Sequence, residues 1–164
     1  MTKIWMLVLF VVLCFSGCAV ATFETVDDPN DVQVMAVPAA LLVELPEDAA
    51  APAMEGMSGK LYFCEDYYIA VETLASGNLD ATLRTLTGFD REELSPVQTK
   101  RCGVPCYEAA WSAAGESGDE IGRVLVLDDG SFHYCVSVMA SASDAAQCAD
   151  AWTALLESVA LAES

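Results

Sequence analysis

Apolar residues near the middle of the chain recur at helical spacing in two adjoining segments. The first segment spans residues 66–76 and ends before Gly77. Its apolar positions are Tyr67, Ala70, Val71 and Leu74. A second segment begins after Asn78, a favourable N-cap, and ends at Gly88, a favourable C-cap. The pattern predicts two consecutive helices, followed by a short helical turn at 90–94 that Ser95-Pro96 breaks.

The clearest signal further along the chain is a β-hairpin. Two β-rich runs within 123–139 flank Asp129-Gly130, and glycine readily adopts the left-handed conformation that such a turn requires. A last helix then begins near Ser141 or Ser143. Its apolar face comprises Ala145, Cys148, Trp152, Leu155, Leu156 and Val159. Residues 107–114 could form a strand or a helix, and their alanine content favours a helix.

These elements together predict an α+β domain over residues 60–164. Helices come first, a small antiparallel sheet containing the hairpin 123–139 follows, and the C-terminal helix packs across that sheet. A domain of this size has one core and limited stability, so covalent cross-links would help it.

The N-terminus carries a different pattern, an apolar run from Ile4 to Phe15 preceded by Lys3. This run is shorter than the roughly 20 residues that span a bilayer, and it is typical of a signal peptide. The next residues are Phe15-Ser16-Gly17-Cys18. They resemble the lipobox of bacterial lipoproteins, although Phe15 is bulkier than the usual leucine. The resemblance implies cleavage after residue 17 and lipid attachment to Cys18.

The lipobox covers the signal sequence alone, and a rival cleavage site follows it. Ala19-Val20-Ala21 fits the general signal peptidase, which would release a soluble secreted or periplasmic protein. If Cys18 carries lipid, the absence of Asp at position 19 implies, by resemblance, an outer-membrane lipoprotein facing the periplasm or the exterior. The order of helix, cysteine and hairpin is also similar to small exported bacterial proteins, a resemblance that implies no activity.

Residues 19–59 differ from the head in composition. They are acidic, contain no Lys or Arg, and hold four of the six prolines. Such a stretch favours an extended tether between a lipid anchor and a folded domain. Valines and leucines within 32–45 leave open the alternative that this segment adds one or two strands to the head.

Charge excludes several classes of partner. The 164-residue chain has 25 acidic and 7 basic residues and a net charge of −18. Nucleic acid binding requires a basic surface, so we expect no nucleic acid partner. We expect membrane attachment only through the N-terminal lipid, and a protein partner in the cell envelope could bind the head.

Seven cysteines are the most conspicuous chemistry in the sequence. Cys14 leaves with the signal peptide, and Cys18 is either lipidated or removed. An oxidising compartment favours disulfides among the remaining five. We predict a Cys64–Cys135 bridge and a local Cys102–Cys106 bridge, with Cys148 as a free thiol on a core face. Cys135–Cys148 is disfavoured because strand and helix rise differ too much from the connecting turn.

A redox or metal site is the alternative use of these cysteines. Cys102-x3-Cys106 resembles the copper site of exported assembly factors of the SCO type, which use a distant histidine, here His133. Zinc bound by these three residues and Cys135 is a variant of that idea. Thioredoxin-like C-x-x-C spacing is missing, and so is the nucleophile elbow of a hydrolase.

The sequence therefore predicts an exported, lipid-anchored envelope protein that acts as a non-catalytic binding or scaffolding module without a cofactor. A periplasmic redox protein, or a copper- or zinc-binding one, centred on Cys102, Cys106 and His133 is the alternative.

Overall fold

The computed structural model describes residues 36–49, 51–115 and 118–162. Backbone contacts divide the chain into two units, Met1–Val37 and Pro38–Ser164, and all elements described below belong to the second. The predicted signal peptide and lipobox, residues 1–18, lie outside the described residues. Among the helices of the described ranges, none is long and apolar enough to cross a membrane.

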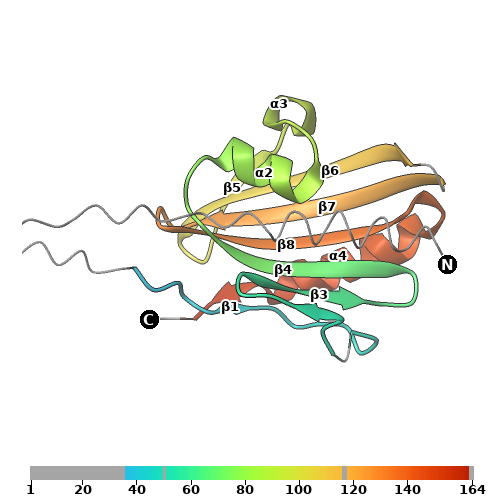
Figure 1. Cartoon of the computed structure of the whole chain (residues 1–164), viewed down its shortest axis with the longest axis horizontal. Helices are drawn as coiled ribbons and strands as arrows, with labels where there is room; N and C mark the ends of the chain where they lie inside the picture. The colour runs from blue at the N-terminus through green and yellow to red at the C-terminus, as the bar shows by residue number, and fades with distance from the viewer. Residues whose placement is uncertain (1–35, 50, 116–117, 163–164) are drawn as a thin grey trace, which may run out of the picture. The chain divides into compact units, whose positions relative to one another are not determined.

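A seven-stranded antiparallel sheet in the order β2-β3-β4-β8-β7-β6-β5 forms the centre of the second unit (Figure 1). Its strands, in chain order, are β2 (Met54–Glu55), β3 (Gly59–Phe63), β4 (Tyr67–Ala75), β5 (Val97–Arg101), β6 (Val104–Gly115), β7 (Gly118–Asp128) and β8 (Phe132–Ser141). A separate two-stranded ladder pairs β1 (Leu41–Leu42) with β9 (Ala160–Leu161). The fold is therefore mixed α+β, with more sheet than the sequence predicts.

Side chains alternate between the two faces of the sheet along each strand. Both faces carry apolar residues, and helices cover each of them. Helix α4 (Ala145–Ser158), preceded by the 3-10 turn η1 (Ala142–Asp144), packs on one face. Helices α2 (Leu79–Thr87) and α3 (Arg91–Leu94) pack on the other. We call these the α4 face and the α2 face. Along β8, Tyr134, Val136 and Val138 belong to the α4 face, and Cys135 belongs to the α2 face.

Several local predictions are confirmed. The hairpin is β7–β8, paired from Glu120↔Ser141 to Asp128↔His133, and Gly130 in its turn has φ +89°. Helix α2 is capped by the Asn78 side chain, which accepts a hydrogen bond from the Asp80 amide, and ends at Gly88 with φ +81°. The C-terminal helix forms where its apolar periodicity predicts it and packs on the sheet.

The prediction that helices come first is wrong. Residues 66–76 contain strand β4. Every second position from Tyr67 to Thr73 holds an aromatic or β-branched residue, and Ile69 among them is completely buried. The helical spacing seen in the sequence arises because both faces of a central strand are partly apolar. Residues 107–114 lie in β6 and not in a helix, because β7 pairs along their whole length.

The segment 38–59 contributes to this unit, although the composition of 19–59 predicts a tether. Strand β1 pairs with β9 next to α4, and β2 forms one edge of the main sheet. The amide of Ala39 donates a hydrogen bond to the Tyr134 hydroxyl at 2.9 Å. Residues 39–45 therefore lie against the α4 face.

Candidate functional site

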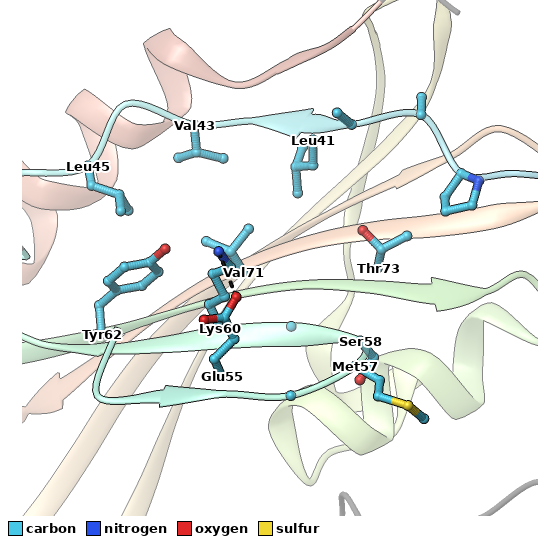
Figure 2. Close-up of a pocket in the computed structure, with 15 residues that line it drawn as sticks. Leu41, Val43, Leu45, Glu55, Met57, Ser58, Lys60, Tyr62, Val71 and Thr73 are labelled. Atoms are coloured by element: carbon cyan, nitrogen blue, oxygen red, sulfur yellow. Dashed lines mark ion pairs between the residues drawn. The ribbon is translucent and has the colours of Figure 1, made fainter. Parts of the chain in front are cut away.

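A groove of about 500 Å³ opens between residues 38–45 and the β2–β3–β4 end of the sheet, on the α4 face. We call residues 38–45 the strap. Figure 2 shows the strap on one side of this groove and strands β2 and β3 on the other. Ligand pockets in proteins span roughly 300–1,000 Å³, so the hollow is large enough for a small ligand.

The strap supplies the apolar wall. Leu41, Val43 and Leu45 are half-buried, alternate with exposed neighbours, and point across the groove toward β3 (Figure 2). Backbone hydrogen bonds hold the strap independently of these side chains. The Ala162 amide donates to the Ala40 carbonyl at 2.9 Å, and the Glu44 amide donates to Ser158 Oγ at 2.9 Å.

Strand β3 supplies the opposite wall, which mixes apolar and polar groups. Lys60 and Tyr62 are two residues apart and so project from the same face of the strand, toward the strap (Figure 2). Val71 of the neighbouring strand lies between them and the strap. Lys60 Nζ lies 2.9 Å from Glu55 Oε1. This hydrogen bond and the nearby negative charge raise the pKa of Lys60, which stays a cation.

Close packing behind the groove requires glycine at position 59. A methyl group there would lie 2.6 Å from Glu72 Cγ and 2.7 Å from the Val71 carbonyl oxygen. A larger residue would push β3 away from β4 and would change the width of the groove.

Four of the five head cysteines lie on the α4 side, among them Cys148, which the sequence predicts to be a free thiol. Cys64 and Cys148 pack in the core of that face, Cys106 is fully buried there, and Cys102 donates a weak hydrogen bond to the Val159 carbonyl at 3.7 Å. Cys135 is buried on the α2 face. The structure therefore places Cys64 and Cys135 on opposite faces of the sheet, and all five thiols in the described ranges are free.

Cys102 and Cys106 belong to one hairpin. Cys102 and Gly103 form its two-residue turn with φ +52° and +80°, and Cys106 lies inside β6 opposite Thr99. Burial raises the pKa of the Cys106 thiol. A reactive or metal-binding thiol needs the opposite shift, so this environment suits a structural cysteine.

His133, the third residue of the alternative site, lies on the α2 face. It is 1% exposed, its Nδ1 is 2.7 Å from Thr82 Oγ1, and its Nε2 is 3.7 Å from Asp128 Oδ2. The sheet separates it from Cys106. Among the described residues, no three His, Cys, Asp or Glu side chains gather as metal ligands would. The structure does not bring Cys102, Cys106 and His133 together.

The groove residues were not singled out as a site from the sequence. Two signals were present: the alternation of Leu41, Val43 and Leu45, and the same-face pair Lys60 and Tyr62. The first was an argument for extra strands only, and the second becomes visible once residues 59–63 are known to be a strand. What the site offers chemically is an apolar wall, a phenol and a paired ammonium group, which suits binding an amphiphile.

No protein-family model matches the chain, and no curated protein matches it. Solved structures do. The chain is similar to a protein of Bacteroides thetaiotaomicron VPI-5482 with a TM-score of 0.51 and 10% identity, over 76% of this chain and 46% of that one. It thus spans about half the length of that protein.

A second solved structure matches over most of its length. It is LpqN, a Mycobacterium tuberculosis protein involved in cell envelope biogenesis. The TM-score is 0.55 with 13% identity, over 77% of this chain and 87% of LpqN. At these identities, the comparisons establish a shared α+β fold.

Proposed function

We propose that the protein is an exported envelope protein, anchored by lipid on Cys18, whose head binds the apolar chain of an amphiphile in the groove. The observation that carries this proposal is that Leu41, Val43 and Leu45 pack at the margin of the α4 core and are left half-buried where they line the groove. An apolar chain laid along these side chains would remove their surface from water, which contributes about 25 cal/mol per Å².

The polar groups beside the groove orient such a ligand. Tyr62 is 9% exposed, and its hydroxyl points toward the strap (Figure 2). The Lys60–Glu55 ion pair lies on the same side of the groove. Because both charges of this pair already satisfy each other, the polar end of the ligand would accept a hydrogen bond from Tyr62 or Lys60.

An envelope location is supported by two independent observations. The residues Phe15-Ser16-Gly17-Cys18 resemble a lipobox, and the fold resembles that of LpqN, which is involved in cell envelope biogenesis. The proposed anchor and the proposed binding activity have separate tests.

Fluorescence of cis-parinaric acid, an apolar probe with a carboxylate head, tests the binding activity. The full chain carrying Cys18→Ala, purified without detergent, should bind the probe. Val43→Glu places a charge in the apolar wall, and Val43→Trp fills the groove. Each should weaken binding at least tenfold. Val97→Glu adds the same charge at an exposed position on β5 and should change binding less than twofold.

All variants share the same N-terminus, so any probe binding to residues 1–22 contributes equally to each. Circular dichroism melts establish that each variant is folded. Equal affinity in all four proteins, or no binding by the parent chain, would contradict the groove as a ligand site.

Incorporation of labelled palmitate into the chain expressed in a bacterium tests the anchor. The wild-type chain should take up label, and Cys18→Ala should abolish it. Cys14→Ala is the matched control and should retain the label. Continued labelling of Cys18→Ala would exclude the lipobox assignment and favour cleavage at Ala21.

A further inference from the structure

The outer edge of β6 is covered only along its first half. Strand β5 pairs with Val104–Glu108, and the next residue before it, Pro96, has no amide hydrogen to continue the ladder. Residues 109–114 pair with β7 on one side. On the other side, no strand of the described ranges pairs with them. Figure 1 shows this half of β6 running beyond α3 at the top of the sheet.

This open edge lacks the features that usually prevent strand addition. Sheet edges are protected by charged residues, prolines, bulges or short length. Residues 109–114 read Ala-Ala-Trp-Ser-Ala-Ala, without charge or proline. The protected edges of the same sheet differ: β5 carries Lys100 and Arg101, and β2 has two residues.

The open edge is also accessible. Trp111 lies across Gly122 of β7, where a methyl group would come within 2.1 Å of the indole. The indole therefore covers the sheet face and leaves the edge clear. Ala110, Ser112 and Ala114 are exposed. Small side chains allow another backbone to approach to the spacing of a sheet, about 4.8 Å.

Acidic groups flank this edge. Glu108 precedes it on β6, and Asp119 and Glu120 lie opposite Ala114 and Ala113 on β7. One basic residue, Arg123, lies opposite Ala110 on β7, so the three acidic residues outnumber it along the edge. Lys100 and Arg101 lie beyond Glu108 at the far end of β5. A second copy of this chain would bring the same negative charges together, in a molecule whose net charge is −18.

We propose that residues 109–114 of β6 form a docking edge for an extended segment of a partner protein that has basic residues at its ends. The segment would add an antiparallel or parallel strand to the sheet through main-chain hydrogen bonds. This surface is separate from the groove and does not depend on amphiphile binding.

Hydrogen–deuterium exchange of the full chain tests the proposal with three ten-residue peptides. The first alternates Thr and Val between terminal lysines, the second has glutamates at both ends, and the third has lysine ends but two central prolines. The first peptide should slow exchange of those amides within 109–114 that point away from β7 at least tenfold. The glutamate peptide should bind at least tenfold more weakly, and the proline peptide should give no protection.

Two variants distinguish binding at the docking edge from nonspecific attraction between the peptide and the charged protein. Ser112→Lys places a charge on the docking edge and should weaken the lysine peptide at least fivefold. Gln98→Lys adds the same charge on the exposed face of β5 and should change its affinity less than twofold. Protection, without peptide, of those amides within 109–114 that point away from β7 would overturn the proposal, because another part of the chain or a second copy would then cover the edge. Protection confined to other residues would overturn it too.

Discussion

The two faces of the sheet bury different kinds of groups. The α4 face buries a continuous apolar core around Tyr134, Leu125 and Trp152, and the Tyr134 hydroxyl donates a hydrogen bond to Asp129 at the margin of this core. The α2 face buries every buried polar residue of the described ranges, namely Thr82, His133 and Ser137. Apolar contacts stabilise without directional demands, whereas a buried polar pair must meet in one geometry.

The proposed binding site belongs to one of these two faces. Helix α4 covers the centre of its face, and the strap covers the β3–β4 end and leaves the groove open. On the α2 face, α2 and α3 close over Leu83, Val124 and Val126. The α4 face thus combines the larger apolar core with the proposed ligand site, and the α2 face fixes the position of one helix pair.

Removing the largest apolar side chain of α4 should give the largest effect. Trp152 is 3% exposed, so Trp152→Ala should lower the free energy of unfolding by about 3–5 kcal/mol. Urea denaturation followed by circular dichroism measures this change. Thr153→Ala, its exposed neighbour, should cost less than about 0.5 kcal/mol. Similar losses for the two variants would contradict the role of the α4 core.

Breaking the hydrogen bond between Thr82 and His133 on the α2 face should lower the free energy of unfolding by a smaller amount. Thr82→Val keeps the shape of the side chain but leaves His133 Nδ1 without its partner at 2.7 Å. The expected loss is about 1–3 kcal/mol in the same denaturation assay. Thr85→Val changes an exposed threonine on the same helix, whose hydroxyl bonds only the Ala81 carbonyl, and should be nearly neutral. If both variants changed the free energy of unfolding equally, the Thr82–His133 hydrogen bond would not stabilise the fold.

A still smaller, pH-dependent effect is expected at Glu72. Its half-buried carboxyl lies opposite Cys135 on the α2 face, and burial raises its pKa. A raised pKa in the folded state means that the charged carboxylate destabilises folding as the pH rises through that pKa, and that the cost is absent below the unfolded pKa. Glu72→Gln should therefore raise the melting temperature at pH 7 but not at pH 3.

Asp119→Asn controls for the loss of one negative charge, because Asp119 is exposed. It should shift the melting temperature less than Glu72→Gln at pH 7. A gain from Glu72→Gln that is the same at pH 3 and pH 7 would rule out burial of the carboxylate as the cause.

Thiol accessibility compares the centres of the two faces without changing stability. In the reduced chain, maleimide should label exposed Cys102 fastest, while Cys135 on the α2 face and Cys148 on the α4 face should react only after denaturation. Burial raises the pKa of both buried thiols, which reduces the reactive thiolate further. Peptide mapping identifies the labelled residue. Labelling of Cys135 as fast as Cys102 would mean that the α2 face opens.

Local signals with a direct mechanism were readable from the sequence. Gly130 in the hairpin turn, Asn78 as an N-cap and the periodicity of α4 each depend on residues close in the chain. Strand β4 was predicted as a helix because Tyr67, Val71 and Leu74 lie at helical spacing, although in the strand Leu74 belongs to the α2 face and the other two to the α4 face. Pairing with β3 and with β8, whose partner residues lie 57 to 73 positions further along, makes this segment a strand.

The candidate site was harder to predict for the same reason. Leu41, Val43 and Leu45 meet Tyr62 and Val71 only after β1 pairs with β9, which follows the last helix. The cysteines drew attention because their chemistry is visible in the sequence, but no local pattern indicates which face of the sheet each one occupies. The separation of Cys64 from Cys135 follows from strand parity across the whole sheet.

Photoaffinity mapping tests the central claim, that the groove of the α4 face binds an apolar chain, most directly. A fatty acid carrying a diazirine at mid-chain is bound to the full chain with Cys18→Ala, irradiated, and located by mass spectrometry of peptides. Cross-links should concentrate in residues 38–45 and 55–62, and Val43→Trp should remove them. Cross-links confined to other parts of the chain, or unchanged by Val43→Trp, would contradict the account.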